Sequence, residues 1–294
     1  MGETVYLWSR GVLNDHRCEC GEPFSRCVFW TTVVDQAHVR DLHSDAFQSI
    51  WSQRGHSLRS IPRLVLRGRR DPSVAAAARA WEALFAAIAD VTGSTVVIES
   101  SKEPAFWLFL GLVPNVRVHT IHVVRDSRAV AFSWHRRLVR PELAHQRVEL
   151  MGVVPYWKSA LKWSAVNVIF TVLRGGRHRG AFMTVRYEDF ARSPESCLSS
   201  IEGRLPLEAA PSTSQTRGEQ RLAQHSVSGN PVRFEPARLA TVSLDQEWRS
   251  SMPRTARILV ASLTLPLLVA YGYLGRKASR GRASPHPVGE GATD

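Results

Sequence analysis

The stretch that decides the fold reads V-R-V-H-T-I-H-V-V-R-D-S-R-A-V-A-F-S-W and covers residues 116–134. Residues 116–124 are rich in β-branched side chains and have strand length, which predicts a buried strand. The strand ends at Arg125, and Asp126 can cap a helix that runs through Arg128. We expect an anion here, because free backbone N–H groups, the helix dipole and a guanidinium all favour a phosphate.

A second stretch has the same plan. T-V-V-I-E-S-S-K-E-P at 95–104 predicts a strand over 95–99 that ends in polar residues. A strand at 181–186 and helices at 28–53, 72–91, 104–112, 127–139, 155–174 and 194–204 complete the expected elements. This alternation predicts an α/β fold with a doubly wound parallel sheet and flanking helices. Ligands of such sheets bind at the carboxyl ends of the strands, where Lys102, Arg125 and Tyr187 lie.

Six segments, in order along the chain, resemble sulfotransferases of the bacterial type that use 3′-phosphoadenosine-5′-phosphosulfate (PAPS) and have a P-loop-like fold. They read G-E-T-V-Y-L-W (2–8), C-E-C-G-E-P-F-S-R-C-V-F-W (18–30), I-E-S-S-K-E-P (98–104), V-V-R-D-S-R-A-V-A-F-S (123–133), V-R-Y-E-D-F (185–190) and H-S-V-S-G-N-P-V-R (225–233). Glu99 stands where the family usually has Asp. The resemblance covers residues 2 to 273.

The resemblance implies a role for particular residues. Arg125 and, eight residues later, Ser133 would grip the 3′-phosphate. Other residues expected to bind the donor are Arg128, Tyr187, Gly229, Asn230 and Arg233. Lys102 would offset charge on the transferred group, and Glu3 would act as the general base. Sulfuryl transfer needs no metal, so none is expected in the catalytic site.

One part of the family pattern is not found. Its members carry a strand and a loop of the kind G-x-x-R-S-G-S-T, which cradles the 5′-phosphosulfate, ahead of a V-G-E segment. Met1 stands almost at that point of this sequence. We expect an N-terminally clipped reading of the gene, with a truncated pseudoenzyme as the alternative. Without the first strand, the strands 116–124 and 181–186 are expected to flank a gap.

Composition sets the broad class of the protein. The 294 residues are 44% hydrophobic, which indicates one globular domain over residues 1–276, with helical insertions at about 38–92 and 140–175. The 38 basic and 26 acidic residues give a net charge of +12, which favours anionic ligands. No aromatic-interleaved basic patch points to nucleic acid. Residues 277–294 are rich in Gly, Pro, Ser and Arg, which predicts a disordered tail.

Three features bear on membranes and redox state. No signal peptide is evident, and the apolar stretch 258–275 is interpreted as a buried helix rather than a membrane span. Four cysteines without a signal argue for the cytoplasm.

Cys18, Cys20 and Cys27 lie close together in the sequence. However, C-x-C is cramped for one zinc ion and a fourth ligand is not certain, so packed or free thiols are the main expectation.

The sequence therefore predicts a cytoplasmic PAPS-dependent sulfotransferase, or a clipped version of one, that acts on a hydroxyl of a carbohydrate, lipid or small metabolite. A non-catalytic nucleotide-binding or interaction module is the alternative. A basic nucleic-acid binder is a third, weaker reading. The acceptor and the oligomeric state cannot be read from these residues, because acceptor pockets lie in variable loops.

Overall fold

The computed structural model describes residues 2–38, 57–136, 152–174, 180–205, 225–229 and 242–274. The α-helices are α1 (Val28–Gln36), α3 (Ile61–Leu66), α4 (Pro72–Thr92), α5 (Pro104–Leu110), α6 (Ser127–His135), α7 (Tyr156–Leu173), α8 (Tyr187–Arg192), α9 (Pro194–Glu202), α11 (Trp248–Ser251) and α12 (Arg254–Ala270). Short 3-10 and π turns cover Thr4–Tyr6, Leu7–Val12, Phe24–Arg26, Leu58–Ser60 and Gly68–Arg70. The strands are β1 (Thr120–Val124) and β2 (Phe182–Arg186).

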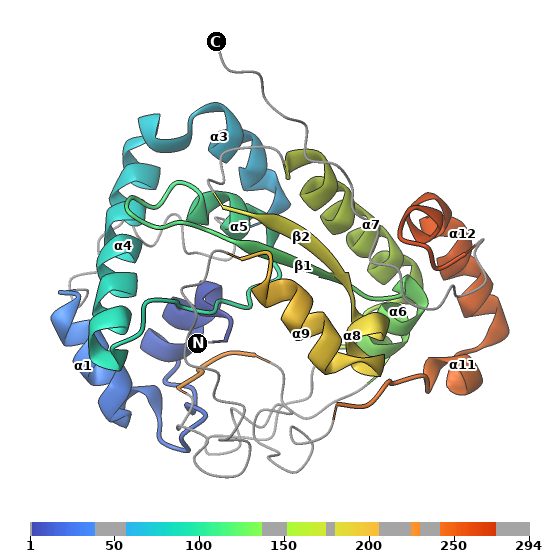
Figure 1. Ribbon diagram of the computed structural model, residues 1–294, viewed down its shortest axis with the longest axis horizontal. Coiled ribbons are helices and arrows are strands. Elements are labelled where there is room, and N and C mark those ends of the chain that lie inside the picture. Colours follow the sequence, from blue (N-terminus) through green and yellow to red (C-terminus); the bar gives the residue numbers. More distant parts are fainter. Residues whose placement is uncertain are drawn as a thin grey trace.

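The two strands form a parallel sheet in the middle of the molecule (Figure 1). Thr120 pairs with Phe182 and Val124 with Arg186, so both strands end at the same level. The described part of the chain is mixed α/β and mostly helical, and its sheet has two strands rather than the larger doubly wound set. The prediction of a gap between these strands is wrong, because β1 and β2 are direct hydrogen-bonded neighbours.

The strand expected at 95–99 is not formed. A strand is defined by its hydrogen-bonded neighbour, and no described strand lies beside this segment. Its neighbour Ser100 instead donates a backbone hydrogen bond of 2.9 Å to the carbonyl of Gly2, in a non-strand segment. Ile98, which strand burial would have covered, is 76% exposed.

Helix α4 follows its sequence signals closely. Asp71 caps it by accepting hydrogen bonds from the backbone N–H groups of Ser73 and Val74, and Pro72 occupies the first turn. Gly93 ends the helix in the left-handed conformation at φ 63°, which a residue without a Cβ adopts readily. The buried face carries Trp81, whose ring lies 5.2 Å from that of Phe106 in α5.

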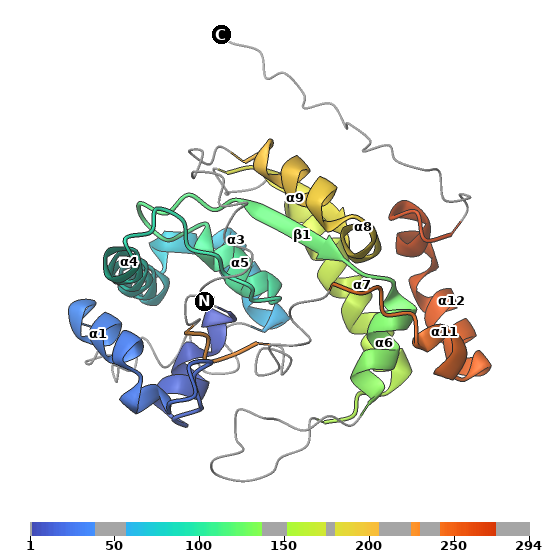
Figure 2. The same ribbon diagram turned by 60° about the horizontal axis from the view of Figure 1, so that its bottom comes forward.

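Among the described residues, the hydrophobic core forms two clusters, which lie toward opposite sides of the molecule in Figure 2. The larger cluster joins α1, α4, α5 and the N-terminal turns around Trp30, Trp81 and Phe106. The smaller cluster joins α6, α7, α11 and α12 around Trp248 and Val260. In Figure 2, α1, α4 and α5 lie on one side of β1, and α11 and α12 lie on the other.

Helices α5 and α7 cover one face of β1. Trp107 of α5 donates a 2.9 Å hydrogen bond to Thr120 Oγ1 and lies 4.8 Å, ring to ring, from Phe170 of α7. The His122 ring stacks on the same Phe170 at 4.8 Å. These contacts hold β1 against α5 and α7, and so they set the position of Arg125, the residue that follows the strand.

The C-terminal apolar stretch forms α12, which packs on α6 and α7. Val260 and Leu268 are fully buried on it, whereas Ile258, Leu265 and Val269 are 58%, 49% and 54% exposed. The helix that the sequence predicted to be buried is therefore packed on one face. Among the residues that the structure describes, no helix is both long enough and apolar enough to cross a membrane.

Candidate functional site

Arg125 and Tyr187 follow directly after the two paired strands. Val124 and Arg186 are paired in register at the ends of β1 and β2. The residues that follow the two strands therefore lie side by side. The Arg125 guanidinium lies 4.6 Å from the centre of the Tyr187 ring, a cation–π contact. Trp163 of α7 donates a 3.1 Å hydrogen bond to the Arg125 carbonyl and fixes the turn.

Asp245 is the anion that Arg125 holds in this structure. Arg125 Nη2 donates to Asp245 Oδ2 at 2.8 Å, and Arg125 Nε is buried without a hydrogen-bond partner among the described residues. Burial by itself would raise the pKa of Asp245, but the hydrogen bond and charge of Arg125 outweigh it, so that pKa lies below its ordinary value. A buried N–H group without a partner is suited to donate a hydrogen bond to a further anion.

Carboxylates surround the N-terminus of α6. Asp126 caps the helix by accepting from the backbone N–H of Arg128 at 2.9 Å. Arg128 closes back on the same carboxylate through Nε at 2.9 Å and Nη2 at 2.6 Å, and its guanidinium lies 4.8 Å from a Trp248 ring. Arg128 is thus already paired with a carboxylate of the protein, that of Asp126. Its role in binding a donor stays a prediction.

Glu188 and Tyr273 also belong to the group around Arg125, Asp126 and Tyr187, which we call the strand-end cluster. Glu188 Oε1 accepts a 3.1 Å hydrogen bond from the backbone N–H of Asp126. Tyr273 Oη donates to Glu188 Oε2 at 2.6 Å and also lies 3.0 Å from the Val124 carbonyl. Burial, and then the charge of Glu188, raise the pKa of Tyr273 above its ordinary value, so it remains a donor.

A second cluster unites Glu3 with Lys102, the two residues predicted to carry the chemistry. They are 99 residues apart in the chain, and Lys102 Nζ donates to Glu3 Oε1 in an ion pair. Ser228 Oγ donates to Glu3 Oε2 at 3.1 Å, and Arg10 Nη1 donates to Ser228 Oγ at 2.7 Å. The start of the chain, the S-S-K segment and the loop 225–229 therefore meet at one carboxylate.

Glu99 holds these segments together. Its Oε1 accepts from the backbone N–H of Thr4 at 2.9 Å and from the Thr4 hydroxyl at 3.0 Å. Its Oε2 accepts from the backbone N–H of Ser101 at 2.9 Å. Burial raises the pKa of Glu99 above its ordinary value although these hydrogen bonds oppose the change.

The loop 225–229 packs so closely on Gly2 that only glycine fits there. A Cβ on Gly2 would lie 2.0 Å from Ser226 Oγ and 2.3 Å from the Ser228 carbonyl, and its φ is 75°. The backbone N–H of Glu3 donates to that same carbonyl at 2.9 Å. The position of the Glu3 carboxylate is thus set by backbone contacts as well as by its partners.

Glu103 and α7 connect the two clusters. Tyr6 Oη donates to Glu103 Oε1 at 3.3 Å, and Lys162 Nζ lies 3.7 Å from the same oxygen. Lys162 is followed by Trp163, which holds the Arg125 carbonyl. A short chain of contacts therefore runs from the Glu3 cluster to the strand-end cluster.

The structure brings Glu3 and Lys102 together, and Arg125 and Tyr187 together. Ser133 lies in the last turn of α6, half-buried. Gly229 ends the loop that contacts Glu3, while Asn230 and Arg233 lie outside the described residues, as does the expected tail 277–294. The members of these clusters that the sequence did not single out include Asp245, Glu188 and Ser228. Glu188 and Ser228 stand inside recognised motifs, whereas no local pattern marks Asp245.

A third group consists of Cys18, Cys20, Cys27 and His225. Their sulfur and ring-nitrogen atoms all lie within 4.8 Å of one another. The sequence offered three of these residues as a group without a certain fourth member. His225 could not be assigned to it from spacing, because it follows Cys27, the last cysteine of the group, by 198 residues.

Comparison of the chain with protein-family models, curated proteins and solved structures finds no match.

Proposed function

We propose that this chain is a sulfotransferase that moves a sulfuryl group from PAPS to a hydroxyl of a carbohydrate, lipid or small metabolite. The observation that carries the proposal is the contact between Glu3 and Lys102. The motif resemblance assigns them the roles of base and charge stabiliser, and the fold brings them together from distant segments. The proposal keeps the doubly wound sheet that the resemblance implies.

The strand-end cluster is suited to hold the nucleotide end of the donor. Arg125 would bind the 3′-phosphate through its buried Nε and through Nη2, which now contacts Asp245. Tyr187, packed on that guanidinium, presents an aromatic ring beside which an adenine can stack. Ser133, Arg128, Gly229, Asn230 and Arg233 complete the proposed set. The phosphate would take the place of the Asp245 carboxylate.

The Glu3 cluster would perform the transfer. The acceptor hydroxyl oxygen attacks sulfur, the bond from sulfur to the bridging phosphate oxygen breaks, and Glu3 takes the hydroxyl proton. Lys102 Nζ would offset the negative charge that gathers on the departing oxygen. Ser228 and Lys102 hold both oxygens of Glu3 in place, which limits the geometries that the base can adopt. This chemistry requires no metal.

The described cysteines are all free thiols. We place the proposed activity in the cytoplasm, the reducing compartment that the four cysteines of a long chain favour.

Calorimetric titration with adenosine 3′,5′-bisphosphate and with adenosine 5′-phosphate tests the donor site. Arg125→Ala should weaken binding of the bisphosphate by roughly ten- to hundredfold, because a charge-assisted contact is worth about 1.5–3 kcal/mol. Binding of the monophosphate should change little. Arg69→Ala removes an exposed arginine outside the site and serves as the control. Equal losses for both nucleotides would show that Arg125 is structural.

Transfer itself is followed with labelled PAPS and a panel of hydroxyl acceptors. Glu3→Gln keeps the size of the side chain and removes the base, so bisphosphate affinity should persist while transfer falls. Bisphosphate binding without transfer to any acceptor, in the unaltered protein, would favour the alternative of a nucleotide-binding module.

A further inference from the structure

Three cysteines and one histidine converge beside the N-terminal turns. Cys27 Sγ lies 3.3 Å from His225 Nδ1, Cys18 Sγ lies 3.7 Å from the same nitrogen, and Cys20 Sγ lies 3.7 Å from Cys27 Sγ. Within the described ranges this is the group whose ligand atoms could surround a metal ion. The four side chains come from two segments that are far apart in the chain.

These three separations fit a single tetrahedral ion, and the other pairs of ligand atoms lie within 4.8 Å. Zn–S bonds of about 2.3 Å and Zn–N bonds of about 2.0–2.1 Å at tetrahedral angles put ligand sulfurs about 3.8 Å apart, and sulfur and nitrogen about 3.6 Å apart. The observed values of 3.7 Å between sulfurs and 3.3 and 3.7 Å between sulfur and nitrogen lie close to both. Three sulfurs and one imidazole are also a donor set that zinc favours.

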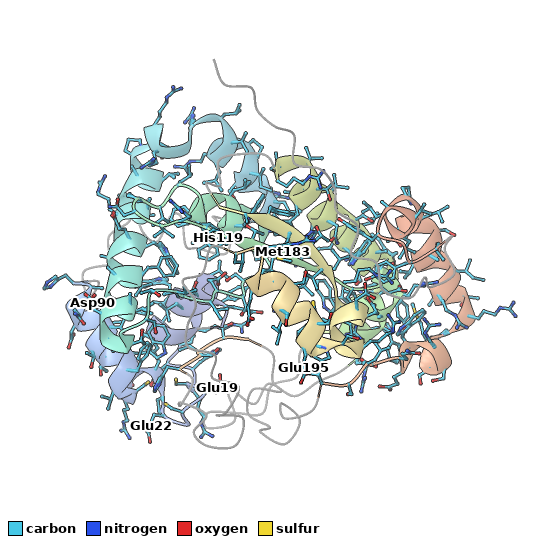
Figure 3. All side chains as sticks on the ribbon, in the orientation of Figure 1. Glu19, Glu22, Asp90, His119, Met183 and Glu195 are labelled. Carbon is cyan, nitrogen blue, oxygen red and sulfur yellow. The ribbon has the colours of Figure 1, made fainter. Side chains whose placement is uncertain are left out.

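The backbone conformation explains how Cys18 and Cys20, although separated by one residue, can both face one ion. The chain turns back on itself after Cys18, whose N–H donates to the Glu22 carbonyl at 2.8 Å, and Gly21 takes a φ of 97°. Arg17 and Pro23 form an antiparallel bridge that closes the turn. Glu19 and Glu22, labelled in Figure 3, flank Cys20 on this turn.

The remaining two ligands are held by α1 and by the loop. Cys27 is the N-cap residue of α1, so the start of this helix fixes its position. The His225 ring stacks on Phe29 at 4.6 Å with a 13° tilt, and the next residue, Ser226, accepts a 3.0 Å hydrogen bond from Glu19 N–H. Cys18 and Cys27 are buried and Cys20 is exposed, so an ion has a way in.

We propose that Cys18, Cys20, Cys27 and His225 form a structural zinc site, with His225 bound through Nδ1. All four positions are taken by protein ligands, which is the arrangement of a structural rather than a catalytic zinc. The ion would fasten loop 225–229 to the N-terminal turns, and that loop carries Ser228, the partner of Glu3. The proposal does not depend on the sulfotransferase assignment, and its readout is the metal.

The test is metal analysis of the full chain purified under reducing conditions with zinc present. We expect about one zinc ion per chain, released when a mercurial reagent modifies the thiols. Cobalt titration of the stripped protein should give the visible absorption of tetrahedral Co²⁺ together with thiolate charge-transfer bands. The metal content should be retained in Cys197→Ser, which alters the described cysteine outside the group, on α9.

Two substitutions of His225 separate ligation from folding. His225→Ala should lower zinc affinity by at least about tenfold, whereas His225→Cys should retain the ion in a four-cysteine site with a matching change in the cobalt spectrum. Stripped protein that gives no tetrahedral cobalt spectrum would overturn the proposal and leave packed thiols. So would equal metal loss in Cys197→Ser, or a Cys20–Cys27 disulfide in the freshly purified protein.

Discussion

At the scale of single residues, the site is organised by charges that already have partners. Arg125 contacts Asp245, Arg128 contacts Asp126, and Lys102 contacts Glu3. A ligand phosphate at Arg125 must therefore compete with a carboxylate that belongs to the protein. Such competition lowers affinity and makes it sensitive to changes in either partner.

We predict that Asp245→Asn tightens binding of adenosine 3′,5′-bisphosphate. Asp245 and Arg125 are both partly exposed, so their interaction is worth about 0.5–1 kcal/mol, and its removal should raise affinity about two- to fivefold. Calorimetric titration measures the change, with Asp189→Asn, which alters an exposed carboxylate on α8, as the matched control. Weaker binding in Asp245→Asn would mean that Asp245 positions Arg125 rather than competing for it.

His122 should make stability depend on pH. Burial lowers its pKa from the ordinary 6.5 to about 4, while the hydrogen bond to Asn167 Oδ1 at 3.1 Å partly opposes this; Tyr271 also faces the ring. The folded protein then keeps His122 neutral, whereas the unfolded chain takes up a proton below its pKa. Stability from this residue is full above about pH 6.5 and declines toward about pH 4, by up to about 3 kcal/mol.

Denaturant unfolding at about pH 5 and about pH 7 measures this dependence. His122→Gln should flatten the difference between the two conditions, since glutamine does not titrate. His135→Gln, a substitution of an exposed histidine, should leave it in place. An unchanged pH dependence in His122→Gln would assign the effect to other groups.

At the scale of elements, local signals predicted helices better than strands. Asp71, Pro72 and Gly93 mark both ends of α4, because caps and stops act within a few residues. Segment 95–99 has the composition of a strand but lies beside no described strand, and composition cannot supply the neighbour. The Glu3–Lys102 contact and the Cys–His group depend on long-range packing, so the sequence offered their members without their pairing.

We predict that Asp71→Ala destabilises the fold by about 1–2 kcal/mol. Asp71 caps α4 and also accepts two hydrogen bonds from Arg63, at 2.6 and 2.9 Å. The Arg63 hydrogen bond, as the largest influence, holds the pKa of Asp71 below its ordinary value, so this stability is lost as pH falls below that value. Denaturant unfolding measures the loss. Asp90→Ala, on the exposed face of the same helix, should change stability by less than about 0.5 kcal/mol.

At the scale of the whole molecule, the two core clusters flank a sheet that is only partly covered. Met183 and Val185 on β2 are buried, while their register partners Ile121 and Val123 are 39% and 58% exposed. An exposed apolar strand without a further described neighbour invites association with other chains.

We predict that the protein self-associates and binds an apolar-surface dye through this face. Replacing Ile121 and Val123 together with Thr should reduce both, because Thr keeps β propensity and adds a polar group. Val172→Thr, which alters an exposed valine on α7, is the control. Sedimentation and dye fluorescence give the result. A monodisperse monomer that does not bind the dye would contradict the prediction.

The contact between His225 and the N-terminal cysteines also has a consequence for biosynthesis. Because 198 residues separate Cys27 from His225, the first part of the chain leaves the ribosome long before its partner. At about 5–20 residues per second, that delay is about 10–40 seconds. During this interval the nascent chain carries three unengaged thiols, and Glu3 lacks the Ser228 hydroxyl. The N-terminal turns therefore reach their final structure only after most of the polypeptide has been translated.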